Sequence, residues 1–302
     1  MANETLLVEF LGEHPGIVVR LPPLIPTFET YNLRSQALVQ NAVAVAGLPA
    51  PSPTVAVTDT EWIGCPFLVM PRVSGTIPGP APLFDPWITG ASLPDQRKVH
   101  DGLIDTLVAV HAVDWMAHNL GPVLPGPSLA ETLQYWTDYV RWAGEGDPLP
   151  ELSTALDWCR RHRPAESDAA EGEPVLLWGD ARLGNLVFDD HREVHAILDW
   201  DLAAIGPREM DLGWYFGLEF MMEELFGHRV PGFPGRSEGL ARYEALSGHT
   251  VTHLGWHEVF ALARGLALND RIQRIAGSTR RSDNPMGGVL LARMKAVENR
   301  DS

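Results

Sequence analysis

In the N-terminal quarter of the chain, most hydrophobic residues occur in short runs that are typical of β-strands. Residues 5–10 (TLLVEF) and 16–20 (GIVVR) are separated by a glycine-bounded turn at 12–16, and the two runs predict a hairpin. Residues 54–57 and 66–70 are short apolar runs that predict two further strands. This part of the chain is therefore expected to be β-rich.

Elsewhere the hydrophobic positions recur at the spacing of helices. Residues 29–46 contain neither glycine nor proline, and their apolar residues predict a helix that ends at Gly47. Residues 95–113 have the apolar stripe of an amphipathic helix. Similar patterns predict further helices at 129–142, 152–163, 209–225, 239–246 and 257–275.

The segment at 71–94 is rich in proline and glycine, and it predicts an irregular connection between two lobes. We therefore expect an α+β fold with a small β-rich N-terminal lobe at 1–72 and a larger, mainly helical C-terminal lobe at 73–302. The hinge is expected near 70–75. A cleft between two such lobes is a usual place for a ligand.

The charge of the chain changes this picture in one respect. With 302 residues and a net charge of -16, the chain is not expected to bind nucleic acid or an anionic membrane as its main partner. An acidic surface would suit a cationic substrate. The N-terminus lacks the pattern of a signal peptide and no apolar stretch has membrane-spanning length, so the sequence predicts a cytoplasmic protein. Lysine occurs only at Lys98 and Lys295.

Two sets of residues that could suggest other chemistry have simpler explanations. Cys65 and Cys159 are too few for a disulfide framework and are expected to be reduced packing residues. His249, His253 and His257 recur at intervals of four residues, a spacing that a helix could use to bind a metal. Gly248 and Gly255 interrupt that stretch, however. A loop that leads into a helix is the preferred interpretation. The tryptophans are expected mainly in the core, with a few left as candidates for a substrate pocket.

Four polar residues follow two buried apolar runs and form the most informative pattern of the chain. Asp180, Arg182 and Asn185 lie on one loop after the run at 176–177, and Asp199 follows a second run at 197–198. We expect the two runs to pair as a hairpin. Turn chemistry explains any one of these residues, but not the ordered set.

Phosphoryl transfer gives each of the four residues a role. Asp180 would accept a hydrogen bond from a substrate hydroxyl and act as the base, and Arg182 would neutralise charge on the transferred group. Asn185 and Asp199 would hold a magnesium ion on the phosphates, since hard cations prefer oxygen ligands. The pattern therefore predicts catalytic roles for Asp180 and Arg182 and metal-binding roles for Asn185 and Asp199.

The same region resembles a known family. The run from Gly179 to Asn185, followed by Leu198-Asp199-Trp200-Asp201, Gly206-Pro207 and Asp211-Leu212, is similar to the aminoglycoside phosphotransferase-like kinases. The similarity is strongest to a bacterial branch that resembles the kinase domain fused to some acyl-CoA dehydrogenases, and it covers nearly the whole chain. The resemblance implies a protein-kinase-like fold that binds ATP and Mg²⁺ between its lobes.

The resemblance also implies roles for particular residues. Adenine would lie against the hinge near 68–73, and Asp211 would brace the catalytic loop, with His111 packed nearby. The residues implied to contact the nucleotide are Arg20, Val69, Met70 and Arg72.

The chain departs from the family pattern at several positions. Arg20 stands where relatives have a phosphate-binding lysine, and Gln36 stands where they have its glutamate partner, so at most a neutral hydrogen bond is expected between the two. Trp178 stands where relatives commonly have histidine. The chain begins within the glycine- and serine-rich phosphate loop, near Asn3, so the N-terminal lobe is expected to be truncated and to offer fewer backbone N–H groups to the triphosphate.

Three hypotheses follow. The leading one is an ATP- and Mg²⁺-dependent phosphotransferase that acts on a hydroxyl of a small molecule, either aminoglycoside-like or a hydroxyacyl-type metabolite. The alternative is a catalytically weak or inactive kinase-like module that binds a nucleotide. A third is metal-dependent hydrolysis by the same carboxylates. The sequence leaves the acceptor, the preference for ATP or GTP and the oligomeric state open.

Overall fold

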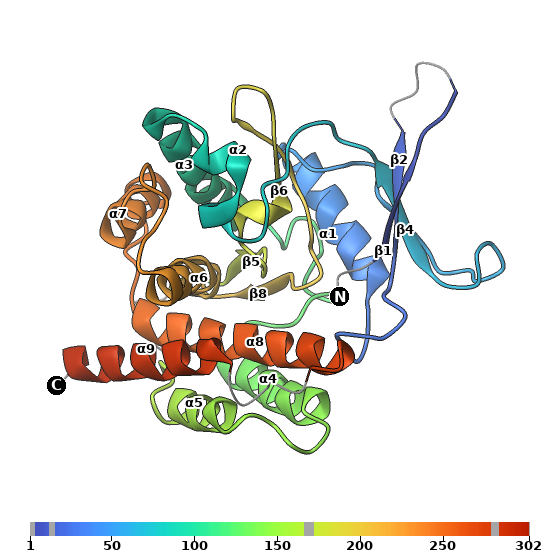
Figure 1. The fold of residues 1–302 in the computed structure, drawn as a ribbon. Coiled ribbons are helices and arrows are strands. Elements are labelled where there is room, and N and C mark those ends of the chain that lie inside the picture. The colour runs from blue at the N-terminus through green and yellow to red at the C-terminus, as the bar shows by residue number, and fades with distance from the viewer. Residues whose placement is uncertain (1–3, 12–15, 166–171, 279–283, 302) are drawn as a thin grey trace.

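A four-stranded antiparallel sheet forms one end of the molecule (Figure 1). The computed structural model describes residues 4–11, 16–165, 172–278 and 284–301. The predicted hairpin is confirmed, since the two N-terminal strands pair in register. The turn at 12–15 and Asn3 lie outside the described residues. The sheet has the order β1 (Glu4–Val8), β2 (Ile17–Leu21), β4 (Phe67–Pro71) and β3 (Val55–Val57).

Helix α1 (Leu33–Val45) packs against this sheet. Leu33 and Ala37 of α1 form a small buried cluster with Leu68 and Met70 of β4. The helix begins later than the apolar pattern indicated because the side chain of Asn32 caps it by accepting a hydrogen bond from the Ser35 N–H. The four-residue spacing of apolar positions thus located the helix, whereas the polar cap fixes its first residue.

The segment between the lobes is mostly irregular, as predicted, but it contains two short helical turns. These are η1 (Pro82–Phe84) and α2 (Pro86–Thr89). The Asp85 side chain caps α2 by accepting hydrogen bonds from the Trp87 and Ile88 N–H groups. Proline is common at the first position of a helix, and Pro86 occupies that position in α2. The high proline content of the segment had hidden this signal.

Helices make up most of the other lobe (Figure 1). The predicted helices are present, with bounds shifted by a few residues, and a further helix follows residue 284 that the sequence pattern did not indicate. Helix α8 lies against α4, α5, α6 and α9, so it runs through the middle of this lobe. The helices are α3 (Leu93–His111), α4 (Leu129–Ala143), α5 (Pro150–Arg161), α6 (Glu209–Phe226), α7 (Arg236–Ser247), α8 (Leu254–Ile275) and α9 (Pro285–Asp301).

Two small ladders lie between α1 and α6, and they correct one expectation (Figure 1). Strand β5 (Val175–Leu177) pairs with β8 (Ala204–Gly206), and β6 (Leu186–Phe188) pairs with β7 (Val194–Ile197). The predicted hairpin between the runs at 176–177 and 197–198 is therefore wrong. The reason is the apolar run of β6, which directly follows Asn185 and takes the place beside β7.

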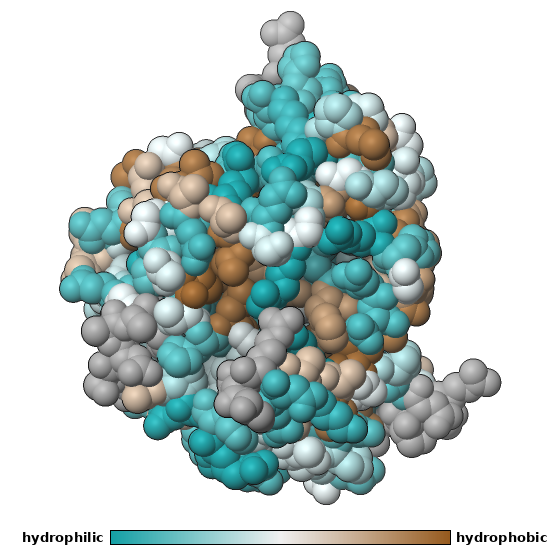
Figure 2. All heavy atoms as spheres, turned by 90° about the vertical axis from the view of Figure 1, so that its left-hand side faces the viewer, coloured by the Kyte–Doolittle hydropathy of each residue, from teal (hydrophilic) through white to brown (hydrophobic). Residues whose placement is uncertain are grey.

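The surface agrees with the composition. The face shown in Figure 2 is largely hydrophilic, with small separate hydrophobic patches. Within the described parts of the chain, no helix combines the length and the apolar character needed to cross a bilayer.

Candidate active site

Asp211 supports the loop between β5 and β6 through hydrogen bonds, as expected. The Asp211 carboxylate accepts hydrogen bonds from the backbone N–H groups of Trp178 (2.7 Å) and Gly179 (2.8 Å). His111 on α3 places its Nε2 at 3.1 Å from Asp211 and its Nδ1 at 2.7 Å from the Tyr243 hydroxyl. These partners suit an imidazole that donates through Nε2 and accepts from Tyr243. The geometry of the loop is therefore set by α3, α6 and α7.

The Asp180 carboxylate is fixed by three donors. Its Oδ2 accepts hydrogen bonds from Arg182 Nε (2.9 Å) and Asn185 Nδ2 (2.8 Å). Its Oδ1 accepts one from Trp214 Nε1 at 2.9 Å. A carboxylate has about four acceptor positions, so the three donors leave room for one more hydrogen bond. Trp214 belongs to α6, and the sequence had not distinguished it from the tryptophans expected in the core.

Asn185 and Asp199 lie side by side. The Leu198 N–H donates to the Asn185 backbone carbonyl at 2.9 Å, which brings Asp199 next to Asn185. Asn185 directs its Nδ2 group at the Asp180 backbone oxygen (3.0 Å) and at Oδ2. Its side-chain Oδ1 is thus the atom left to face a cation. Asp199 has φ of +62°, a left-handed conformation that aspartate tolerates better than most residues.

An amide oxygen and a carboxylate are hard ligands that fit Mg²⁺. No group of three or more histidine, cysteine or acidic side chains that could hold a metal exists among the described residues. Mg²⁺ in nucleotide enzymes commonly uses one or two protein ligands and completes its shell with water and phosphate oxygens. The pair Asn185 and Asp199 suits that arrangement and not a metal cage built from protein alone.

Arg20 reaches from β2 to the carboxylates that follow β7. Its Nη2 lies 3.3 Å from Asp199 Oδ1 and 3.8 Å from Asp201 Oδ1. Burial alone would lower the pKa of Arg20, but the two carboxylates outweigh it and raise the pKa. The sequence allowed at most a neutral hydrogen bond between Arg20 and Gln36. Among the described residues this bond is not formed, and Gln36 Oε1 is buried without a partner. Arg20 thus bridges the two lobes.

The residues predicted at the hinge lie on or beside β4. Met70 is buried toward α1, with Gln40 Nε2 at 3.6 Å from its sulfur. Val69 points to the opposite face of the strand. Arg72 is exposed and pairs with Glu9 at 2.6 Å. The structure therefore places Arg20 beside Asp199 and Asp201 but ties Arg72 to the N-terminal hairpin.

A pocket of about 420 Å³ opens beside the loop between β5 and β6. We call it the central pocket. Gly179, Asp201 and Asp211 line one side, Trp136 of α4 lines another, and Arg264 of α8 reaches it from the middle of the lobe. Sequence reasoning missed Arg264. The available signal was a single arginine within the otherwise apolar stretch of α8.

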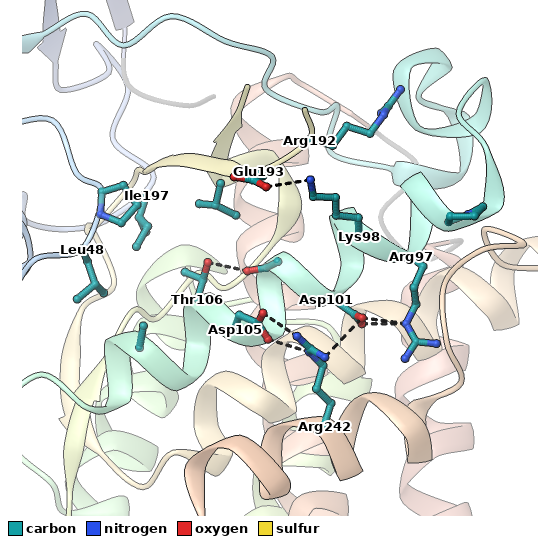
Figure 3. A pocket seen from close by; sticks show the side chains of 15 residues that line it. Leu48, Arg97, Lys98, Asp101, Asp105, Thr106, Arg192, Glu193, Ile197 and Arg242 are labelled. Carbon is teal, nitrogen blue, oxygen red and sulfur yellow. Dashed lines mark hydrogen bonds and ion pairs between the residues drawn. The ribbon is translucent and has the colours of Figure 1, made fainter. Parts of the chain in front are cut away.

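A second pocket, of about 630 Å³, lies on the outer side of α3 (Figure 3). We call it the peripheral groove. Six of its charged side chains are paired with one another: Arg242 with Asp105 at 2.7 Å, Arg97 with Asp101 at 3.0 Å, and Lys98 with Glu193 at 3.0 Å. Arg192 instead donates to the Trp87 carbonyl at 3.0 Å.

The predicted loop that leads into a helix near residues 249–257 is confirmed. His249 and His253 precede α8, and His253 is its N-cap residue with φ of +52°, so the three histidines do not share a helix face. Cys65 and Cys159 are free. Trp178 is fully buried, and its Nε1 donates to the Leu198 carbonyl at 2.8 Å, which ties the start of the loop to the segment of Asp199.

Comparisons with known proteins agree with this geometry. The profile of the phosphotransferase enzyme family matches residues 5–246. A curated relative, acyl-CoA dehydrogenase family member 10 of Mus musculus, is 28% identical over 203 residues, which are 66% of this chain but only 18% of that protein.

Two solved structures show the same fold. A putative aminoglycoside phosphotransferase from Ralstonia eutropha superposes with a TM-score of 0.71 at 22% identity, covering 98% of this chain and 94% of the other. An aminoglycoside phosphotransferase in a ternary complex with ADP and hygromycin B has a TM-score of 0.56 at 12% identity, with coverage of 97% and 93%. The expected kinase-like fold with two lobes is thus confirmed, and the chain belongs to the phosphotransferase enzyme family.

Proposed function

We propose that this chain uses ATP and Mg²⁺ to phosphorylate a hydroxyl group of a small molecule, with Asp180 as the catalytic base. The observation that carries the proposal is the Asp180 carboxylate, which three donors hold in one orientation with one acceptor position left. A general base must lie within hydrogen-bond distance of the proton that it accepts, whatever its pKa. Residues of the loop and of α6 hold this carboxylate in position.

In the proposed reaction the acceptor hydroxyl donates its proton to Asp180. The hydroxyl oxygen forms a bond to the γ-phosphorus of ATP, and the bond from that phosphorus to the β–γ bridging oxygen breaks. The electron pair of the broken bond leaves with ADP. Arg182 would neutralise charge that develops on the transferred phosphoryl group, since positioned cations stabilise such transition states.

The nucleotide would lie between the lobes, and we propose a boundary between them after Arg72. Arg20 would contact the phosphates, and Val69, Met70 and Arg72 would form the hinge side of the site, of which Met70 would contribute its backbone. Asn185 Oδ1 and Asp199 would hold Mg²⁺, which supplies positive charge next to the phosphate oxygens. The solved phosphotransferase of the same fold that was crystallised with ADP supports the use of an adenine nucleotide.

The acceptor is proposed to be an aminoglycoside-like compound or a hydroxyacyl-type metabolite. The first follows from the hygromycin B in the ternary complex, and the second from the name of the mouse relative. One observation favours the alternative of a weak or inactive module: Arg20 is already engaged by Asp199 and Asp201. Nucleotide phosphates would have to compete with these carboxylates for the guanidinium group.

The test combines Asp180→Asn with two measurements. The first is the thermal shift with ATP and Mg²⁺ compared with ATP and chelator, and we expect a magnesium-dependent shift in both proteins. The second is ADP release with an acceptor, which we expect to fall by about 10²- to 10⁴-fold in Asp180→Asn because the base is lost. Asp105→Asn in the peripheral groove is the matched control.

Three results would contradict parts of the proposal. Without a magnesium-dependent shift, the kinase function is wrong. A shift without turnover on any acceptor would favour the nucleotide-binding module. Unchanged turnover in Asp180→Asn would remove Asp180 from the role of base.

A further inference from the structure

Arg264 is a buried cation that forms no ion pair with any residue that the structure describes. It lies on α8 with 5% of its surface exposed and lines the central pocket. Its Nε is a buried donor that lacks an acceptor, and within the described residues no hydrogen bond or ion pair to Arg264 is present. Buried arginines are almost always paired with an acid, because an unpaired charge inside a protein is costly.

Aromatic rings surround the guanidinium group in place of an acid. Its centre lies 4.8 Å from the ring of Trp214 and 5.5 Å from each of the rings of Trp136 and Phe260. Burial lowers the pKa of Arg264 to about 10, although the more distant carboxylates of Asp211 and Asp180 act to raise it. The side chain therefore keeps its positive charge at neutral pH.

Three of the acids near the pocket accept from other donors, whereas Glu131, which also lines the pocket, is exposed to solvent. Asp211 accepts from the backbone of Trp178 and Gly179. Asp180 accepts from three side chains, and Asp201 lies within 3.8 Å of Arg20. The chain is rich in acids overall, and the peripheral groove shows arginines paired with them in the usual way (Figure 3). The isolation of Arg264 is thus a property of this pocket.

We propose that Arg264 binds an anionic group, a carboxylate or a phosphate, on the hydroxyl compound that accepts the phosphoryl group. The proposal rests on the kinase function proposed above. Guanidinium binds both groups through two parallel hydrogen bonds. Trp214 contacts both Arg264 and Asp180. The Arg264 guanidinium lies 4.8 Å from the centre of its ring, and its Nε1 donates to Asp180 at 2.9 Å. The anionic group and the reacting hydroxyl would then lie on one substrate, about one indole ring apart.

This assignment reverses the expectation from net charge. The value of -16 suggested a cationic acceptor, but net charge describes the whole surface and not one pocket. A small hydroxy acid or a phosphorylated alcohol would pair with Arg264, which a polycationic aminoglycoside would not, although Glu131, Asp201 and Asp211 also line the pocket.

The test is a binding experiment on the full chain with matched probes. By calorimetry, with ADP and Mg²⁺ present, we would measure 3-hydroxypropanoate, 4-hydroxybutanoate, 5-hydroxypentanoate and 6-hydroxyhexanoate against their amides, and glycerol 3-phosphate against glycerol. At least one anionic probe is expected to bind about 100-fold more tightly than its neutral partner, as for a buried charge pair. Arg264→Met should abolish the difference and Arg264→Lys should keep part of it. Arg242→Met, in the peripheral groove, should keep all of it.

Stability provides a second readout that separates ligand binding from a structural role. Arg264→Met replaces an unpaired buried charge by an apolar side chain, so its melting temperature should equal or exceed that of the wild type. A lower melting temperature would indicate that Arg264 supports the fold and would count against the proposal.

Several outcomes would overturn the proposal. These are equal binding of charged and neutral probes, a preference that survives in Arg264→Met, or no anionic probe with a Kd below about 10 mM. A loss of ADP affinity instead of acceptor affinity would assign Arg264 to the phosphates of the nucleotide and would also overturn it. If an anionic preference depends on Arg264 but no probe is phosphorylated by ATP and Mg²⁺, the proposed kinase function fails while the anion site stands.

Discussion

The arginines of the peripheral groove and the arginine of the central pocket have different partners. Arg242 lies at the surface, with Asp105 at 2.7 Å and Asp101 at 3.7 Å. Arg264 lies inside the protein among three aromatic rings. Exposed ion pairs contribute about 0–1 kcal/mol each, whereas an unpaired buried charge is destabilising. The two regions therefore differ in whether their arginines have acidic partners within the described part of the chain.

The largest expected effect tests how tightly the central pocket is built. Gly179 has φ of +89°, and a Cβ there would collide with the Leu202 carbonyl. Gly179→Ala should therefore lower the free energy of unfolding by roughly 2–6 kcal/mol, from backbone strain and overlap together.

Gly47→Ala is the matched control, because Gly47 has a similar φ of +91° but no atom within 4 Å of the added Cβ. It should show the strain alone. Urea unfolding of both variants would measure the difference, and equal losses would contradict the tight approach at Gly179.

The next largest effect is on the stability of the fold in acid, and it comes from His100 on α3. His100 is buried next to Asp101, and burial lowers its pKa from 6.5 to about 4, although Asp101 acts to raise it. Between these pH values the unfolded chain binds a proton at His100 that the folded chain does not. The free energy of unfolding should therefore fall as the pH falls from 6.5 toward 4, by at most about 3 kcal/mol from this residue.

Urea unfolding at several pH values would measure this slope in the wild type and in His100→Gln. The variant lacks the titrating group, so its slope should be shallower. An identical slope would show that other groups cause the loss of stability in acid.

A smaller effect separates the two contacts of Trp214. Trp214→Phe removes the hydrogen bond to Asp180 but keeps an aromatic ring beside Arg264. We expect kcat to fall about tenfold, the equivalent of roughly 1.4 kcal/mol, with little change in the KM of an anionic acceptor. A rise in KM without a fall in kcat would show that the ring matters and that the hydrogen bond does not.

The smallest effect is expected in the groove itself. Arg242→Met breaks exposed ion pairs to Asp105 and Asp101. The free energy of unfolding should change by less than about 1 kcal/mol, and kinase activity should not change. Thermal unfolding and steady-state kinetics would measure this, and a loss of activity would show that the groove takes part in function.

Much of the fold was predictable because its signals are local. The strands of the N-terminal sheet and most helices were located from apolar spacing, and Asp180, Arg182 and Asn185 share one loop. Asp199 was expected near that loop because the strands before Asp180 and Asp199 were predicted to form a hairpin, and that hairpin is not formed. The strand at 186–188 intervenes, so Asp199 is brought to Asn185 by β6 and β7 and not by a hairpin with β5.

The missed residues of the site depend on tertiary packing. Trp214 and Arg264 lie 34 and 84 positions beyond Asp180, on helices that cross the loop only in the folded chain. Helical spacing placed Trp214 one turn after Asp211, but could not show which side chain its Nε1 would meet. The partners of Arg20 were equally hidden, since a spacing rule suggested Gln36 whereas the fold supplies Asp199 and Asp201.

The chain of contacts from Tyr243 through His111 to Asp211 has a consequence for folding kinetics. It joins residues separated by 132 and 100 positions in the sequence. Such contacts are slow to form, because closing long loops carries an entropic cost before any contact repays it. During synthesis the loop that carries Asp180 cannot acquire this full support until residue 243 has left the ribosome. A nascent chain that stops short of α7 would therefore contain every residue of the Asp180 loop and still lack its final geometry.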